Sequence, residues 1–565
     1  MQMWHPTELR KEITYLEQEF RLKKMKQANF LQFLIGILAC LSVLCINAED
    51  PYRYFTWNVT YGLIYPLSVP QQGILINGQF PGPPIEAVTN DNIIVNVINN
   101  LDEPFLITWN GIKQRRTSWQ DGVLGTNCPI PPNSNWTYKF QLKDQIGTYT
   151  YFPSTLLHRA VGGFGAINVA ARSVIAIPYQ IPDAECTFLV SDWYNASHKA
   201  LQKQLDAGLS LPLPDGILIN GSPNKFTFTG EIGKTYRLRI SNVGIKTPIN
   251  FRIQGHNMTL IEVEGAHTLQ EVYDTIDVHV GQSVAVLVTC HATPKDYFIV
   301  ASTRFTGRTT LTANATLHYA GSNTPASGPL PICPTYQIHW GIKHARTIRR
   351  LNLTANAARP NPQGSFHYGT IKVSRTLNLT ISSTKIADKL RYALNGVSYV
   401  DPDTPLKLAD WYNIPGVFSF NTIKDTLTTP PGPAVLGVSV VNVTLHDFVE
   451  IVFQNPEKSI QSMHLDGNSC YVVGYGSFPW TPDMRERYNL ADGIPRHTYP
   501  VFPQSWTAVL CSLDNKGMWN LRSQIWENRY LGQQAYIRVW NDEESVFTEA
   551  EPPLNALYCG KAKQP

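Results

Sequence analysis

A five-residue repeat constrains the fold of this 565-residue chain more than any other feature. The segment Ile-Leu-Ile-Asn-Gly occurs at residues 74–78 and again at 217–221, and a fainter copy, Ala-Leu-Asn-Gly, lies at 393–396. Copies separated by more than a hundred residues indicate duplicated domains rather than a solenoid of short repeats. The chain is therefore expected to contain three related domains.

Each copy of the repeat is followed by a run with the pattern of a β-strand, at residues 93–99, 235–242 and 449–455. In the second run, apolar and polar residues alternate, which predicts a strand with one buried face. No long helical pattern follows residue 50, and the 40 prolines and 38 glycines favour short strands with many turns. We predict an all-β chain of three β-sandwich domains in tandem.

The predicted domains occupy residues 50–170, 171–330 and 371–551. Residues 331–370 are interpreted as a basic linker, and residues 552–565 as a C-terminal tail. The hydrophobic share of 43% and the net charge of +4 are typical of a folded globular protein. No helix-turn-helix, RNA-recognition or zinc-finger pattern occurs, so no nucleic-acid partner is expected.

The N-terminal region predicts export. Residues 30–46 are apolar except for Gln32 and Ser42, and Ala48 precedes an acidic start. We interpret residues 25–48 as a signal peptide that begins at Met25, and residues 1–24 as a dispensable or misassigned extension. An uncleaved signal anchor is the alternative. Residues 557–565 lack the hydrophobic tail of a GPI signal, so the protein is predicted to be secreted and not GPI-anchored.

Glycosylation motifs and cysteines agree with an extracellular destination. Seven cysteines remain after the signal peptide, and an odd count leaves at least one thiol unpaired within the chain. Nine N-x-S/T acceptor sites are predicted. They are Asn58, Asn135, Asn195, Asn220, Asn257, Asn314, Asn352, Asn378 and Asn442.

Four further motifs resemble those of plant multicopper oxidases. Residues 77–83 read NGQFPGP, residues 119–122 WQDG, residues 162–165 GGFG and residues 517–519 GMW. The resemblance covers nearly all of residues 50–551 and implies three cupredoxin-like, Greek-key domains. Within that family, the chain resembles the monocopper-oxidase-like branch, which contains skewed-root proteins and pollen-specific ascorbate-oxidase homologues.

The resemblance also locates the copper-ligand positions, where histidine and cysteine are replaced. A mononuclear copper needs a thiolate and two imidazoles, because hydroxyls and amides do not hold copper there. The matching residues are Gln461, Ser523, Asn528 and Gln533. At the trinuclear cluster the matching residues are Thr108, Asn110, Phe152, Ser154, Asp466, Arg522 and Gln524, with His464 retained. Oxidase activity is therefore predicted to be lost, and no catalytic residue is assigned.

Two interpretations of His464 remain open. A single imidazole is more often a hydrogen-bonded core residue than a metal ligand. The alternative is one residual copper ion held by His464 and Asp466, in a copper-binding oxidoreductase similar to ascorbate oxidase. Arg522 and Asp466 are also candidates for a buried ion pair. We expect no cofactor, or at most one copper ion.

The stretch from His339 to Arg375 contains ten basic or histidine residues and no acidic one. A solvated linker is the simplest interpretation. A more specific interpretation is that the stretch attracts an acidic wall polysaccharide such as pectin, with Arg346, Arg349 and Arg350 as the polyanion-binding residues. Wall or membrane proteins are the other possible partners.

The family resemblance further implies a disulfide bond between Cys128 and Cys559. It also implies a role for a secreted glycoprotein of the plant cell wall or apoplast, in wall expansion, pollen-tube growth or directional growth. Because fold does not determine function, the expected activity is binding to wall polymers or partners.

Overall fold

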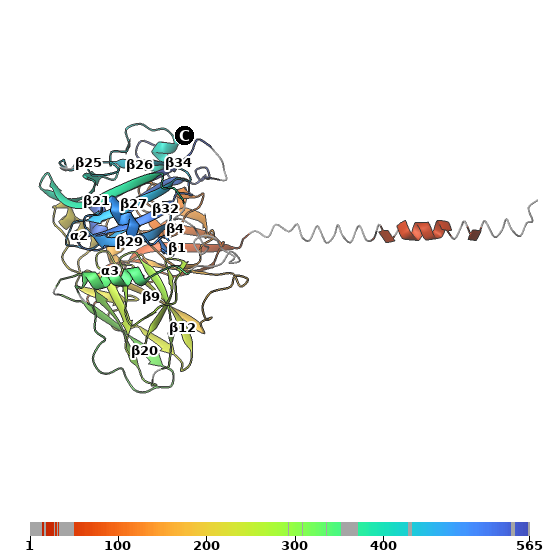
Figure 1. Ribbon diagram of the computed structural model, residues 1–565, viewed down its shortest axis with the longest axis horizontal. Helices are drawn as coiled ribbons and strands as arrows, with labels where there is room; N and C mark the ends of the chain where they lie inside the picture. The colour runs from red at the N-terminus through yellow and green to blue at the C-terminus, as the bar shows by residue number, and fades with distance from the viewer. Residues whose placement is uncertain are drawn as a thin grey trace, which may run out of the picture. The chain divides into compact units, whose positions relative to one another are not determined.

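The computed structural model describes residues 50–562 except 292, 308, 335, 352–370, 428–431 and 544–547, together with 14–15, 19–27, 29–30 and 32. The chain divides into two units, residues 1–51 and 52–565. In the first unit, residues 19–27 are helical (Figure 1). Most of the predicted signal peptide lies outside the described residues. Within the described part of the chain, no helix is both long and apolar enough to cross a membrane.

The first domain is a pair of four-stranded sheets, ordered β2-β1-β4-β6 and β3-β8-β7-β5. Their apolar faces enclose a core that includes Trp57, Trp109 and Tyr151. The elements are β1 (Tyr52–Ile64), β2 (Gln71–Ile76), β3 (Ile85–Val88), β4 (Asn92–Asn99), β5 (Ile107–Asn110), η1 (Ser118–Gln120), β6 (Ser134–Gln141), β7 (Gly147–Pro153), η2 (His158–Val161) and β8 (Gly165–Ala170).

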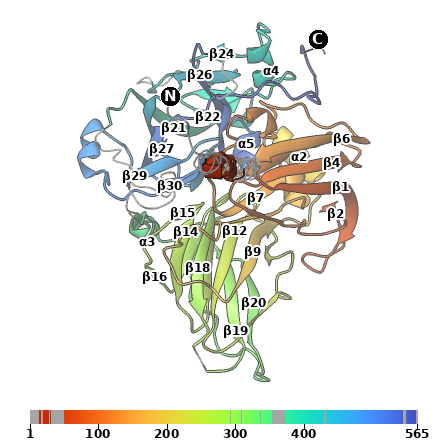
Figure 2. The ribbon, with the colours of Figure 1, turned by 90° about the vertical axis from the view of Figure 1, so that its right-hand side faces the viewer.

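The second domain pairs the sheet β10-β9-β12-β18-β14-β15 with the sheet β11-β20-β19-β13-β17, and β16 adds to β14. Figure 2 shows β14, β18, β12 and β9 side by side. The elements are β9 (Ala184–Trp193), α2 (His198–Asp206), β10 (Gly216–Ile219), β11 (Thr227–Gly230), β12 (Thr235–Asn242), β13 (Ile249–Ile253), β14 (Met258–Val263), β15 (Ala266–His267), β16 (Val272–Tyr273), β17 (Ile276–Val278), β18 (Ser283–Thr289), β19 (Tyr297–Thr303) and β20 (Thr312–Tyr319).

The third domain pairs the sheet β25-β23-β22-β21-β27-β32-β29-β30 with the sheet β24-β26-β34-β33-β28-β31. Its elements are β21 (Arg375–Ile386), β22 (Lys389–Leu394), β23 (Val397–Tyr399), α4 (Leu406–Trp411), β24 (Ser419–Phe420), β25 (Val435–Gly437), β26 (Ser439–Thr444), β27 (Phe448–Asn455), β28 (Gln461–Leu465), β29 (Cys470–Ser477), η4 (Pro482–Arg487), β30 (Pro495–Arg496), β31 (Thr498–Val501), β32 (Ser505–Ser512), β33 (Gly517–Ser523), α5 (Trp526–Tyr530) and β34 (Gln534–Trp540). The predicted all-β fold is confirmed.

The sequence repeat forms the same hairpin turn three times. Asn77, Asn220 and Asn395 have φ of 52°, 48° and 45°, and the glycine after each also has positive φ. Such Asn-Gly pairs form the two-residue turns that match the twist of a hairpin. Each Asn side chain also bonds the backbone of a neighbouring strand. The acceptor carbonyls are those of Thr56, Thr187 and Asn378.

Strand β12 is buried on both faces, which corrects the prediction of one buried face. Arg237 and Arg239 alternate with the apolar residues, yet they are only 8% and 1% exposed. Both pair with Glu185 on the adjacent strand β9, and Arg239 Nη1 also donates to Thr148 Oγ1 of the first domain at 2.8 Å. The polar face of the strand therefore packs against another domain instead of solvent.

The basic linker prediction is wrong for residues 338–351. Residues Ile338–Thr347 form helix α3. Ile342 and Ala345 join the core of the third domain, and Ile348 joins that of the second. These apolar residues recur at helical spacing and give the segment a buried face. Of the rest of the predicted linker, residues 352–370 lie outside the described residues.

Two disulfide bonds link described residues of the chain. The bridge implied between Cys128 and Cys559 joins the first domain to the C-terminal tail, with Cα atoms 5.9 Å apart. A second bridge, which the sequence left open, joins Cys470 to Cys511. Cys186, Cys290 and Cys333 carry free thiols.

Candidate functional site

The four residues predicted at the mononuclear copper position meet in the third domain. Gln461 lies on β28, Ser523 ends β33, and Asn528 lies on α5, followed by Gln533. Gln461 Oε1 accepts hydrogen bonds from Asn528 Nδ2 at 2.8 Å and from Gln533 Nε2 at 3.2 Å. Ser523 Oγ accepts from the Ile525 backbone N–H at 3.2 Å. The result is a buried amide cluster.

This cluster does not fit a blue copper ion. Copper of that type needs a thiolate and two imidazole nitrogens, whereas these side chains offer amides and a hydroxyl. The amide oxygen of Gln461 is also already occupied by two donors, and its Nε2 donates to Ser459 Oγ at 3.1 Å. Binding a cation here would break the hydrogen bonds among Gln461, Asn528 and Gln533, which are at most 4% exposed.

A charged group occupies the predicted trinuclear position. Arg522 on β33 lies opposite His464 on β28 in the strand register. Its guanidinium forms an ion pair with Asp466, which confirms the pair considered from the sequence. His464 Nε2 lies 2.7 Å from Asp466 Oδ1, and His464 Nδ1 lies 2.9 Å from Thr498 Oγ1. Both nitrogens of the retained histidine thus have hydrogen-bond partners, as expected of a core residue.

Three of the remaining trinuclear positions, Asn110, Phe152 and Gln524, belong to a second network around Arg159. Gln524 Nε2 donates to Asn110 Oδ1 at 2.7 Å, and Arg159 Nη1 donates to Gln524 Oε1 at 3.1 Å. The Arg159 guanidinium lies 3.7 Å from the centre of the Phe152 ring, a cation–π contact. Ser154 Oγ donates to the Gly122 carbonyl at 2.5 Å. Thr108 is also fully buried.

Burial and charge shift the acidities in this region. Burial and, to a smaller extent, the Arg522 cation lower the pKa of His464 to about 4. Burial alone would raise the pKa of Asp466, but Arg522 and His464 hold it below its usual range. Burial and the charge of Asp466 raise the pKa of Asp121 well above its usual value. At neutral pH the His464 imidazole is neutral, and Asp466 is a carboxylate that faces the Arg522 guanidinium.

Three residues of this region were not identified from the sequence. Asp121 lies within the motif at residues 119–122 and Arg159 lies just before the motif at 162–165, but neither position is a copper ligand in the family resemblance. His497 lies outside all of the family-like motifs. The His497 ring lies 5.2 Å from that of His464. Even so, His464, His497 and Asp466 do not form a group of three metal-donor atoms within 4.8 Å of one another. Among the described residues, one such group exists, and it lies elsewhere.

The three arginines predicted to bind polyanions differ in availability. Arg350 is only 3% exposed and cannot serve as a surface contact, which corrects its assignment. Arg349 forms ion pairs with Asp492 and Glu271 at 3.3 and 3.9 Å. Arg346 is exposed and donates to the Tyr475 carbonyl at 2.5 Å. The acidic partners of Arg349 come from outside the stretch, so counting charges along the sequence did not reveal them.

Arg346 lines a pocket of about 590 Å³ between α3 and β29. Arg487 from η4 lines the same pocket and is exposed. Aromatic and polar side chains complete its wall, including Tyr475, Trp506 and Asn489. The pocket wall therefore carries two guanidinium groups beside aromatic side chains.

The predicted acceptor asparagines also differ in exposure. Asn352 lies outside the described residues. Four are exposed: Asn58, Asn135, Asn195 and Asn257. Four are partly buried: Asn220, Asn314, Asn378 and Asn442.

Comparisons with known proteins give one consistent result. Three sequence profiles described as "Multicopper oxidase" match residues 58–174, 184–322 and 403–545. The "L-ascorbate oxidase homolog" of Nicotiana tabacum is 50% identical, over 94% of this chain and 97% of its own length. The "Monocopper oxidase-like protein SKU5" of Arabidopsis thaliana is 47% identical, over 94% of this chain and 92% of its own. The crystal structure of Fet3p, "a Multicopper Oxidase that Functions in Iron Import", superposes with a TM-score of 0.74 at 21% identity, covering 86% of this chain and 90% of that one.

Proposed function

The chain belongs to the multicopper oxidase family, and we propose that it is a secreted wall glycoprotein that binds acidic polysaccharide instead of oxidising substrates. The observation that carries the first half of this proposal is the pairing of Arg522 with Asp466 at a predicted copper position. A guanidinium remains charged at any physiological pH and offers no lone pair to a metal. The amide cluster around Gln461 supports the same conclusion for the mononuclear position.

The binding half of the proposal rests on the pocket beside α3. Arg346 and Arg487 present two cations at its wall, and a guanidinium matches the geometry of a carboxylate. The side chains of Tyr475 and Trp506, which are 7% and 3% exposed, line the pocket and offer a sugar ring a small apolar contact. A demethylated pectin chain, which carries a carboxylate on each uronic acid, has the corresponding chemistry. Binding of this kind would connect the protein to wall expansion or directional growth.

Secretion is supported by the chemistry of the side chains. Two disulfide bonds suit an oxidising compartment, and the bridge to Cys559 joins segments 431 residues apart. Four acceptor asparagines are also exposed on the surface. The alternative, an oxidoreductase with a single copper near His464, would need Asp466 to exchange Arg522 for a metal.

The first test measures copper directly. Purified protein supplied with Cu²⁺ should show no intense blue absorption and no oxygen uptake with ascorbate or phenols. The Ser523→Cys variant should also lack the blue band, because Gln461 and Asn528 stay in place of imidazoles. If the parent binds one equivalent of copper and the His464→Gln variant does not, the proposed loss of oxidase chemistry is wrong. The alternative, an oxidoreductase with a single copper near His464, would then be favoured.

The second test uses a pectate column. The parent should elute at a higher salt concentration than the Arg346→Gln/Arg487→Gln variant, because exposed charges are screened within ~8 Å at physiological ionic strength. A matched control, Lys139→Gln/Lys225→Gln, removes two exposed cations outside the pocket. Equal elution of the parent and the pocket variant would contradict pectate binding at this site.

A further inference from the structure

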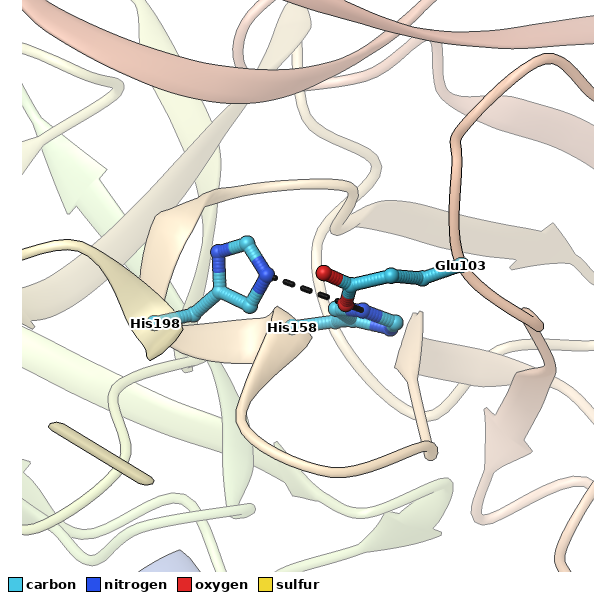
Figure 3. A group of neighbouring side chains, drawn as sticks. All are labelled: Glu103, His158 and His198. Atoms are coloured by element: carbon cyan, nitrogen blue, oxygen red, sulfur yellow. Dashed lines mark hydrogen bonds and ion pairs between the residues drawn. The ribbon is translucent and has the colours of Figure 1, made fainter. Parts of the chain in front are cut away.

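Two histidines and a glutamate meet where the first domain contacts the second, away from the predicted copper positions. Glu103 lies between β4 and β5, His158 begins η2, and His198 begins α2. Figure 3 shows both rings directed at the Glu103 carboxylate. Glu103 Oε2 lies 2.7 Å from His158 Nε2 and 3.2 Å from His198 Nε2. The histidines are 0% and 3% exposed.

The orientation of both rings is determined by their neighbours. His158 Nδ1 lies 2.8 Å from Thr155 Oγ1, so Nε2 is the nitrogen that faces the carboxylate. The His158 ring also contacts Phe105 and His198, at centroid distances of 5.9 and 5.1 Å. The Tyr61 ring stacks on His198. Metal-binding histidines typically have such a partner on the second nitrogen, which orients the ring toward the ion.

The donor set matches a transition-metal site. Two imidazole nitrogens and one carboxylate oxygen lie within 4.8 Å of one another, and the described residues contain no other group of three such donors. Ligands ~2.0–2.2 Å from a tetrahedral Zn²⁺ lie roughly 3.3–3.6 Å apart. The observed separations of 2.7 and 3.2 Å are shorter than this, so the Glu103 carboxylate would have to move away from both rings to admit the ion. A water molecule would supply the fourth ligand.

Lys199 pairs with Glu103 through the other carboxylate oxygen, Oε1. The Lys199 side chain is 57% exposed, so its ammonium stays solvated and costs little to move. Oε2 remains available for a metal while Oε1 keeps the lysine as an outer partner. A pocket of about 380 Å³, lined by Glu103, Leu156 and Lys199, gives solvent access to the carboxylate.

We propose that Glu103, His158 and His198 bind one divalent transition-metal ion, with Zn²⁺ as the preferred occupant, and that this ion joins the first domain to helix α2. Imidazole and carboxylate ligands select Zn²⁺ over Mg²⁺, which prefers an octahedral shell of oxygens and water. The hydrogen bonds of the metal-free cluster hold the same residues in place before the ion binds. The ion would connect the segment after β4 with η2 and α2, so its binding would stabilise the contact between these parts of the chain.

The test titrates Zn²⁺ into the intact, metal-free chain by calorimetry. The parent should bind one equivalent, and His198→Gln and Glu103→Gln should each weaken binding at least tenfold. The Gln at 103 keeps a hydrogen-bond acceptor, so this variant is expected to fold. The His291→Gln variant removes an exposed histidine elsewhere and should bind as the parent does.

Two further measurements define the metal specificity and the ligand set. Zn²⁺ should raise the Tm of the parent and of His291→Gln but not that of Glu103→Gln, and Mg²⁺ should raise none of them. Co²⁺ in the site should give tetrahedral d–d bands without thiolate charge transfer, which excludes Cys186 and Cys333 as ligands. Absence of saturable Zn²⁺ binding, or equal binding by Glu103→Gln, would show that the cluster is a hydrogen-bond network only. The pectate test does not depend on this outcome.

Discussion

Arg522 and Asp466 form an ion pair in which neither side chain is more than 3% exposed. Two strands bring them together: β33 places Arg522 opposite His464, and Asp466 follows the end of β28. Neither charge has bulk water to stabilise it, so each depends on the other. A buried pair is a weak source of net stability, but losing one partner is costly.

We expect Asp466→Asn to lower the free energy of unfolding by about 3–5 kcal/mol, because it leaves the Arg522 cation buried without a counter-charge. Replacing both residues, as Asp466→Leu/Arg522→Met, should cost much less than the sum of the two single changes. Urea denaturation of the parent, Asp466→Leu, Arg522→Met and the double variant measures this difference. Additive effects would mean that the two side chains do not depend on each other.

The neighbouring His464 should make stability depend on pH. Its pKa is lowered to about 4 by burial and by Arg522, compared with about 6.5 in an unfolded chain. The unfolded state therefore binds the proton first as the pH falls. The stabilising contribution is complete above pH ~6.5 and is lost between pH ~6.5 and 4, by up to about 3 kcal/mol.

Comparison with His464→Gln isolates this contribution. The variant should lose less stability than the parent between pH 7 and pH 4.5, because glutamine does not titrate. Parallel stability curves for the two proteins over that range would show that His464 is not held neutral by the fold.

The sequence predicted the all-β fold because the repeat and the alternating runs are local patterns. The basic charge of residues 339–375 led to the prediction of a solvated linker, and Ile342 shows why that was wrong. It lies in this basic stretch, yet it is on the apolar face of helix α3 and is buried in the core of the third domain. The family motifs brought Gln461, Asn528 and Gln533 to one place. The motifs could not predict which amide donates a hydrogen bond to which, because this depends on how the side chains are oriented after the strands pair.

The Glu103 cluster could not be recognised from sequence for a different reason. Its members lie at 103, 158 and 198, in the connection between β4 and β5, in η2 and in α2, without the spacing of a metal motif. Only the docking of α2 against the first domain brings them together. Contact between domains also explains the burial of Arg239 on β12, which donates to Thr148 of the first domain in addition to pairing with Glu185 of the adjacent strand.

The two disulfide bonds should differ in their contribution to stability. Cys128–Cys559 joins residues 431 apart, and Cys470–Cys511 joins residues 41 apart. On the chain-entropy model, the longer loop should contribute about 2 kcal/mol more. Denaturation of Cys128→Ser/Cys559→Ser and Cys470→Ser/Cys511→Ser variants tests this order. A smaller loss from opening the longer loop would show that local contacts outweigh chain entropy here.

The last prediction concerns Asn220, which belongs to a glycosylation motif and also to the repeated turn. Its Nδ2 donates to the Thr187 carbonyl at 2.9 Å, and its Oδ1 accepts from the Leu189 N–H at 2.7 Å. Asn77 and Asn395 form the same turn but are followed by Gly-Gln and Gly-Val, which are not acceptor motifs. The asparagine is thus present for the turn, and Ser222 completes the motif by coincidence.

We expect glycopeptide mass spectrometry to find Asn220 unmodified and Asn257, an exposed asparagine of the same domain, glycosylated. Asn220→Gln should lower the free energy of unfolding by about 1–3 kcal/mol, because the longer side chain loses both hydrogen bonds at a residue with φ of 48°. Asn257→Gln serves as the matched control and should change it little, with both proteins compared after enzymatic removal of glycans. A glycan on Asn220 in the folded protein would contradict this expectation, because the partly buried side chain would have to hold a sugar on Nδ2 beside the Thr187 carbonyl.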